Sequence, residues 1–183
     1  MTAANDARRA GRRQFLLVAS LFLLPLAVAA WLYYSGWRPA AGAHGTLIDP
    51  PRPLPADVFL GQWSLVYLAG GDCDERGRAV LEELSRLRLA LDRDAARVRR
   101  VLLHAGECFT ADFPSGAPDL VVLRASGADG AALRAQFPAA ADGANGIYIV
   151  DPHGNLLMSY PATGSARGLL KDLERLLRLS SIG

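Results

Sequence analysis

Two cysteines and a histidine are the residues of this 183-residue chain with the most specific chemistry. Cys73 and Cys108 can form a disulfide, bind a soft metal ion as thiolates, or remain ordinary buried thiols. A disulfide would close a loop of 35 residues and needs Cα atoms within about 7 Å, which sequence spacing does not establish. His104 precedes Cys108 by four residues and offers an imidazole ligand. The residue types alone leave these states open.

The elements that must position these residues follow from the hydrophobic pattern. Trp63–Leu68 and Val98–His104 are short apolar runs typical of buried strands, and between them Cys73–Leu91 has a helical repeat with Asp72 as its expected N-cap. Strand, helix and strand in this order predict a right-handed parallel unit, so both strands end at one edge of the sheet. The residues expected to share this edge are Cys73, His104, Glu107 and Cys108.

The rest of the chain predicts the remaining elements of one α/β domain. A loop is expected over 106–118, and the apolar run Leu120–Leu123 does not decide between strand and helix. Two strands joined by the turn at 151–154 predict an antiparallel hairpin. The full order is strand, helix, strand, loop, helix, strand, strand, helix. The elements after the loop are a helix at Ala128–Phe137, strands at Gly146–Val150 and Asn155–Tyr160, and an amphipathic helix at Ser165–Leu179.

This order, with a cysteine at the start of the first helix, is the arrangement of the thioredoxin fold. Three stretches resemble the Sco/SenC family, whose members are membrane-anchored thioredoxin-like proteins that assist copper delivery to cytochrome c oxidase. The stretches are Trp63–Tyr67, Cys73–Gly77 and Ile147–Asn155. The resemblance covers residues 58–183. It implies a thioredoxin-like fold, a respiratory oxidase subunit or another assembly factor as partner, and copper as the metal to consider.

The same resemblance implies a copper site with three ligands, of which this sequence keeps one. The family ligands are two cysteines in a C-x-x-x-C loop and a histidine just before the first strand of the hairpin. Cys73 matches the first cysteine, Gly77 stands at the place of the second, and 139–145 contains no histidine. Copper binding and dithiol chemistry at these positions are therefore expected to be weakened or lost. The residues of an alternative, rearranged metal site are Cys73, Cys108 and either His104 or Glu107.

An apolar segment precedes the domain. Phe15–Tyr34 has 20 residues without a charge, enough for a helix of about 30 Å, the thickness of one bilayer core. Four arginines precede the segment, so the positive-inside rule places residues 1–14 in the cytoplasm and the domain on the other side of the membrane. The family resemblance implies that this membrane is a bacterial inner membrane and that the domain lies in the periplasm. The alternative is a cleaved signal peptide, with Ala27–Ala29 as its cleavage site. The length of the apolar run favours an uncleaved anchor.

Residues 35–57 are rich in proline and predict an extended, semi-rigid linker to a domain at 58–183. His44 lies in this linker and is expected to move freely. The segment 57–183 carries 14 basic and 16 acidic side chains, so the folded part has no basic excess. Nucleic acid is therefore not an expected partner. The neighbouring cations Arg97, Arg99 and Arg100 are expected on a solvated face.

Three functions from different classes remain open. The first is a non-enzymatic assembly factor for a respiratory oxidase that has a weakened or lost ability to handle copper. The second is a thiol–disulfide oxidoreductase that uses Cys73 with Cys108, and the third is a copper carrier with a rearranged site. The acidic residues Asp72, Asp74 and Glu75 oppose thiolate formation at Cys73, which disfavours a strongly activated nucleophile. The sequence therefore favours the non-enzymatic function.

Overall fold

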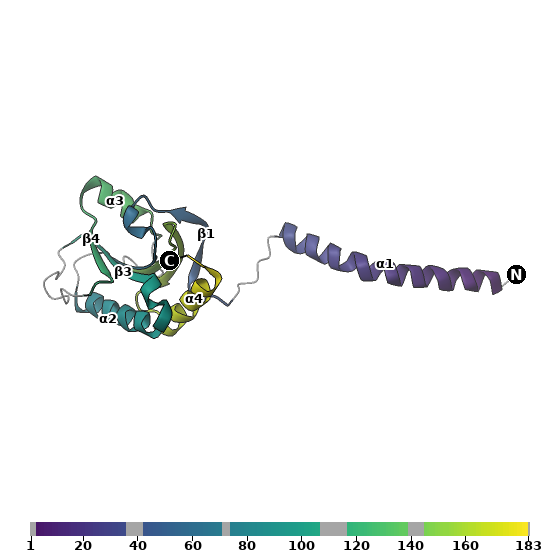
Figure 1. Ribbon diagram of the computed structural model, residues 1–183. Helices are drawn as coiled ribbons and strands as arrows, with labels where there is room; N and C mark the ends of the chain where they lie inside the picture. Colours follow the sequence, from purple (N-terminus) through teal and green to yellow (C-terminus); the bar gives the residue numbers. More distant parts are fainter. Residues whose placement is uncertain (1–2, 36–41, 71–73, 107–116, 139–144, 183) are drawn as a thin grey trace. The chain divides into compact units, whose positions relative to one another are not determined.

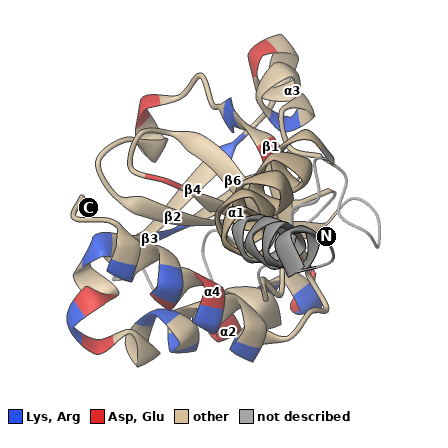
Figure 2. Cartoon of the chain, turned by 90° about the vertical axis from the view of Figure 1, so that its right-hand side faces the viewer, with Lys and Arg blue, Asp and Glu red and all other residues tan. Residues whose placement is uncertain are grey.

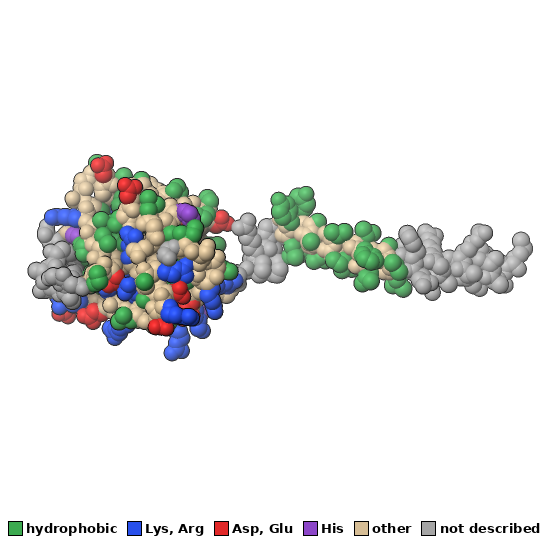
Figure 3. Space-filling view, viewed as in Figure 1, with side chains coloured by type: hydrophobic (Ala, Val, Ile, Leu, Met, Phe, Trp, Pro, Cys, Tyr) green, Lys and Arg blue, Asp and Glu red, His purple; other side chains and the backbone are tan. Residues whose placement is uncertain are grey.

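The computed structural model describes residues 3–35, 42–70, 74–106, 117–138 and 145–182. The chain divides into two compact units, Met1–Gly42 and Ala43–Gly183. The first unit contains helix α1, Ala3–Ser35, in which Leu17–Tyr34 is long and apolar enough to cross a membrane. Hydrophobic side chains are prominent on the visible face of the described part of this helix (Figure 3). The predicted apolar segment is therefore a helix of membrane-spanning length.

A six-stranded mixed sheet forms the centre of the second unit (Figure 1). Its strand order is β1-β6-β5-β2-β3-β4. β2 pairs in parallel with β3, and β3 with β4, whereas the other neighbours are antiparallel. The predicted parallel unit and the predicted hairpin are both confirmed, and the undecided apolar run forms β4. The strands are β1 Thr46–Pro53, β2 Trp63–Ala69, β3 Val98–His104, β4 Leu120–Arg124, β5 Gly146–Val150 and β6 Asn155–Pro161.

Helices cover the two faces of the sheet. Helices α2 (Glu75–Ala90) and α4 (Ala166–Leu179) pack on one face, where their leucines share a core with alternate residues of β2. Helix α3 (Gly127–Ala135) and the short 3-10 helix η1 (Asp57–Phe59) cover the other face. Figure 1 shows α2 and α4 side by side, away from α3. A second short 3-10 helix, η2 (Asp92–Arg97), leads into β3. The predicted thioredoxin-like α/β fold is confirmed.

Helix α2 begins later than the sequence predicted. Its N-cap is Asp74, whose carboxylate accepts a hydrogen bond from the Gly77 backbone N–H at 2.9 Å. The predicted start at Cys73 and the predicted cap Asp72 lie outside the described residues. Any aspartate just before a helix can accept a hydrogen bond from the free N–H groups of the first turn. Residue type alone therefore does not identify which of the neighbouring aspartates is the N-cap.

The segment predicted to be a linker contributes a strand to the sheet. β1 pairs antiparallel with β6 at the edge, and its residue Ile48 is buried. The register shifts between Leu47 and Arg52, where the chain contains Pro50 and Pro51. Proline has no N–H to donate, and an edge strand tolerates it because one side makes no ladder bonds. The compact unit therefore begins at Ala43 rather than at residue 58.

His44 is held in place, in contrast to the prediction that it moves freely. Its backbone N–H donates to Asp172 Oδ2 at 2.7 Å, and its Nδ1 lies 3.2 Å from Asp172 Oδ1. The same Oδ2 also accepts the Gly45 N–H at 3.0 Å and the Tyr160 hydroxyl at 2.9 Å. Asp172 lies on α4 and is only 6% exposed. We call these four residues the Asp172 clamp, because they fasten the start of the domain to α4.

The donors of the clamp set the charge state of Asp172. Burial opposes ionisation, but hydrogen bonds from Gly45, Tyr160 and His44 outweigh it and lower the pKa of the Asp172 carboxyl below its ordinary value. In the opposite direction, burial and the Asp172 carboxylate raise the pKa of Tyr160, which stays a neutral donor. A charged acceptor with several donors makes stronger hydrogen bonds than a neutral one.

We therefore expect Asp172→Asn to lower the free energy of unfolding by about 1–3 kcal/mol at neutral pH. The folded pKa lies below the unfolded one, so this stabilisation is complete above about pH 4 and is lost as the pH falls through the folded pKa. Denaturant unfolding across this range measures the difference between variant and wild type. Glu174→Gln, an exposed carboxylate on the same helix, is the control. A difference that does not shrink in acid would contradict the assignment.

Candidate functional site

The candidate site is the edge of the sheet at which β2 and β3 both end. The two strands pair in register, with Ala69 opposite His104. The chain continues from β2 toward the start of α2, and Asp74 caps this helix on the same side of the sheet. The structure thus places His104 at the edge where it was predicted. Cys73, Glu107 and Cys108 lie outside the described residues, so the metal set of Cys73, Cys108 and His104 stays a prediction.

His104 is 4% exposed, and its Nδ1 lies 2.9 Å from the Gly106 carbonyl oxygen. A carbonyl only accepts, so Nδ1 carries a proton in this contact. In the neutral ring this leaves the Nε2 lone pair available, which is the arrangement found in many metal-bound histidines. Among the described residues no group of three His, Cys, Asp or Glu side chains comes close enough to hold a metal ion. A site at His104 therefore needs ligands from the neighbouring segments.

Tyr67 is a residue of this edge that the sequence analysis did not select. It lies on β2 and is 2% exposed. Burial and the nearby charge of Asp74 raise the pKa of its hydroxyl, so Tyr67 is a neutral phenol. A Cβ atom placed at Gly77 would meet the Tyr67 ring and hydroxyl at 3.4 Å, which is ordinary contact. The Tyr67 side chain therefore lies next to position 77. The sequence did not indicate this contact, because Tyr67 is one residue of an apolar strand.

Asn145 is a second residue that was missed. Its side-chain oxygen accepts a hydrogen bond from the Gly70 N–H at 2.8 Å, which joins the start of β5 to the turn after β2. The family histidine precedes the same strand, so an amide here occupies the neighbourhood of that ligand. An amide oxygen is a hard donor and a poor ligand for copper(I). Asn145 thus positions the turn, and nothing in its chemistry replaces the histidine.

Of the other two histidines, one lies at the opposite end of the sheet and one is bound to α4. His153 is exposed in the β5–β6 turn, and its backbone forms an isolated bridge with Leu60. It borders a surface hollow together with Trp63, the first residue of β2, and thus lies at the opposite end of that strand from His104. His44 belongs to the Asp172 clamp. The predicted separation of His153 from the candidate edge is confirmed.

Arg100 was predicted on a solvated face, and this prediction was wrong. It is 6% exposed and binds Asp119 through Nε at 2.6 Å, while another guanidinium nitrogen donates to the Leu81 carbonyl at 3.1 Å. Burial opposes the ionisation of Asp119, but the Arg100 hydrogen bond and the charges of Arg100 and Arg88 lower its pKa. This ion pair joins β3, the start of β4 and α2. Its partners are satisfied within the fold, which indicates a structural role.

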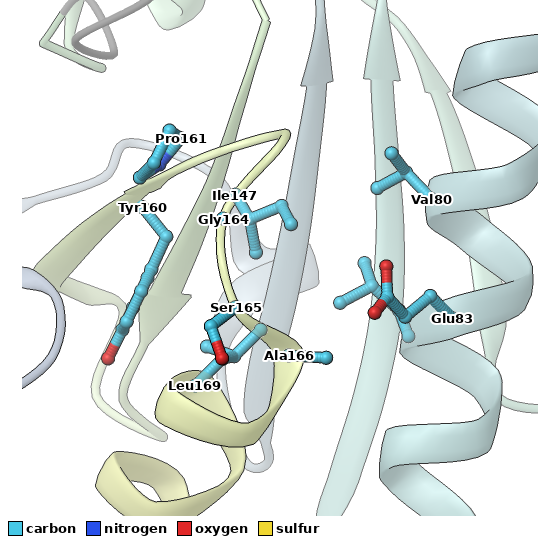
Figure 4. Close-up of a pocket in the computed structure, with 10 residues that line it drawn as sticks. Val80, Glu83, Ile147, Tyr160, Pro161, Gly164, Ser165, Ala166 and Leu169 are labelled. Carbon is cyan, nitrogen blue, oxygen red and sulfur yellow. The ribbon is translucent and has the colours of Figure 1, made fainter.

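A pocket lies between α2 and the end of β6 (Figure 4). Glu83 borders it on the α2 side, and Tyr160 lies across from Glu83 with its hydroxyl directed to Asp172. The cavity volume is about 10 Å³, at the lower limit for a single water molecule. A small-molecule site needs several hundred Å³. This pocket therefore has no room for a substrate.

Comparison with known proteins shows to which family the domain belongs. A family model described as the transmembrane-like, thioredoxin-like, C-terminal domain matches residues 63–180. The chain belongs to this family, and its domain has the Sco-like thioredoxin fold that the sequence predicted. No curated protein matches the chain.

Several solved structures are similar to this chain. The apo Sco1 protein of Thermus thermophilus has a TM-score of 0.51 at 16% identity, over 73% of this chain and 96% of that one. Bradyrhizobium japonicum ScoI, solved with copper bound, has a TM-score of 0.41 at 18% identity, over 73% and 99%. A DsbF homologue from Corynebacterium diphtheriae scores 0.46 at 11% identity, over 76% and 97%. At such identities the likeness to Sco1 concerns the fold.

Position 77 can be tested with a matched glycine. Gly77 and Gly168 are each the third residue of a helix, and each donates its N–H to the N-cap side chain. A Cβ at Gly77 has ordinary contacts, whereas a Cβ at Gly168 would lie 2.7 Å from the His44 Cβ. We expect Gly77→Ala to be neutral or to stabilise by up to about 1 kcal/mol, and Gly168→Ala to destabilise by about 1–3 kcal/mol. Thermal unfolding measures both, and equal effects would contradict the contact geometry.

Proposed function

We propose that the protein is a membrane-anchored assembly factor for cytochrome c oxidase that acts through protein contacts, with copper binding weakened or lost. The observation that carries this proposal is a Sco-like thioredoxin fold with Gly77 at the position of the second motif cysteine. Space does not force a glycine there, because a side chain at 77 would make only ordinary contacts. The edge of the sheet thus has the backbone arrangement of the fold, but the thiolate of the second motif cysteine is absent.

The copper argument rests on ligand chemistry. Thiolates and imidazoles are the side chains that select copper. The copper site implied by the family resemblance uses three of them. In this sequence Gly77 replaces one, and the segment 139–145 before β5 supplies no histidine. Cys73 is the single motif ligand that remains. One thiolate does not compete with the chelating sites that surround a copper ion in a cell.

We further propose a single-pass arrangement in a bacterial inner membrane, with the domain in the periplasm. The apolar stretch Leu17–Tyr34 supports the span. Arg8, Arg9, Arg12 and Arg13 before it support a cytoplasmic N-terminus of residues 1–14, by the positive-inside rule. The partner then lies in or beside the membrane, and a respiratory oxidase subunit or another assembly factor fits this place.

The second candidate function is a thiol–disulfide oxidoreductase or copper carrier that uses Cys73 with Cys108. One observation favours it: His104 lies at the predicted edge and has Nε2 available as an acceptor. Against it, His104 is almost fully buried. A redox or metal-transfer site needs access for its partner, so this function requires the edge to open.

Copper titration separates the two functions. We expect the full chain in detergent to bind no Cu(I) when it competes with a strong chelator, because two of three motif ligands are missing. Gly77→Cys restores the C-x-x-x-C pair and is expected to gain Cu(I) binding, since soft thiolates favour this ion. Gly77→Ser is the matched control. Stoichiometric binding by the wild type that disappears in Cys73→Ser would instead support the copper carrier.

A cellular test addresses the role of the thiols. We expect the double variant Cys73→Ser, Cys108→Ser to support normal oxidase assembly, because protein contacts rather than thiol chemistry carry the proposed function. Haem spectra and oxidase activity of membranes measure assembly, and immunoblotting confirms that the variant accumulates. Loss of assembly with a folded, abundant variant would overturn the assembly-factor proposal and favour the second candidate.

A further inference from the structure

Helix α4 carries a row of cations on its outer face. The leucines of α4 that face the core are Leu169, Leu173 and Leu177, each at most 3% exposed. The residues on the opposite face are exposed, and four of them are basic while one is acidic. Spacings of four and of eleven residues place the basic side chains on the same side of a helix. The basic residues of this α4 row are Arg167, Lys171, Arg175 and Arg178, and the acidic one is Glu174.

The row contrasts with the neighbouring helix. On α2 the exposed charges are of both signs: Arg86 lies 3.8 Å from Glu82, and Glu75 and Glu83 are also exposed. In Figure 2 the ribbons of α2 and α4 carry basic and acidic positions, while the strands are mostly uncharged. Only on α4 do the cations outnumber the anions by three among the described, exposed residues of the helix. Such a stripe fits a negatively charged, extended surface.

The Asp172 clamp ties the chain that arrives from the anchor to this same helix. A Cβ at Gly168 would collide with His44, and Asp172 binds the His44 backbone. Arg167 and Lys171 are the sequence neighbours of these two contact points. Residues 36–42 alone separate the end of α1 at Ser35 from the domain at Ala43. Fully extended, these seven residues span about 25 Å.

We propose that the α4 row docks on the anionic lipid headgroups of the membrane that holds α1. This inference rests on the proposed membrane anchor and adds a second, electrostatic contact to it. The short tether keeps the row at a high effective concentration near the headgroups, so weak individual contacts suffice. Each arginine or lysine near an anionic surface contributes a modest attraction that salt screens. Docking would orient the domain, because α4 lies on one face of the sheet and the side covered by α3 and η1 then points away from the headgroups.

The only lysine of the chain provides the probe. Lys171 lies within the row and is exposed, so a bulky amine reagent reports on its access to solvent. The full chain is placed in nanodiscs of phosphatidylcholine alone or with phosphatidylglycerol, and the labelling rate of Lys171 is measured by peptide mapping. We expect labelling to be about fivefold slower with phosphatidylglycerol, the factor for one cation–headgroup contact. At about 1 M salt, where screening acts over ~3 Å, the difference should disappear.

Matched variants test the row itself. Arg167→Gln with Arg178→Gln removes two of its charges and should abolish the effect of phosphatidylglycerol on Lys171. The control pair, Arg86→Gln with Arg93→Gln, removes two exposed cations from α2 and η2 and should leave the effect intact. Circular dichroism confirms that each variant is folded.

The outcomes are distinct. If wild-type Lys171 is labelled equally fast in both kinds of disc, the docking proposal is overturned. If Lys171 is protected from labelling only in native membranes, the α4 row binds an acidic protein instead. Failure of the chain to remain in discs overturns the anchor itself. Incorporation without protection overturns only the docking. The anchor and the docking surface are therefore tested separately.

Discussion

The buried carboxylate of Asp172 is the interaction on which the placement of the whole N-terminal side of the domain depends. An ionised carboxylate with few partners is costly to bury, and here two backbone N–H groups, a phenol and an imidazole compensate that cost. These donors come from the entry segment at His44 and Gly45 and from Tyr160 on β6. The clamp therefore fixes α4, the sheet and the incoming chain to one another at a single point.

The clamp also explains why a proline-rich segment becomes part of the sheet. Once His44 and Gly45 are fastened to α4, the next residues run along β6 and form β1 at its edge. A Cβ at Gly45 would overlap the Tyr160 ring, so this close approach needs a residue without a side chain. The tether to α1 is shortened as a result, because residues that looked like linker are used within the domain.

The sequence predicted the helices and strands that are specified by the pattern of neighbouring residues. Periodicity located β2, β3, α2 and α4 to within a few residues, since burial of one face imposes a repeat of two or of 3.6. It missed β1 because prolines mask an edge strand. It missed the bond between His44 and Asp172 because 128 residues separate them. Arg100 was misplaced for a similar reason: its charge indicated solvent, and only the fold brings Asp119 to it. Charge pairing over long separations leaves no periodic signal.

The candidate edge and α4 differ in what they offer to a partner. At the edge, His104 is buried and Gly77 lacks a thiolate, so chemistry there requires additional ligands and movement of the surrounding chain. On α4, the cations are already exposed and lie next to the contact points that fasten the tether. An interaction through α4 needs no rearrangement of the fold. A domain that lacks two motif ligands but has an exposed, charged face next to its entry segment suits the proposed role of holding a partner at the membrane, because orientation and proximity then supply what the ligands do not.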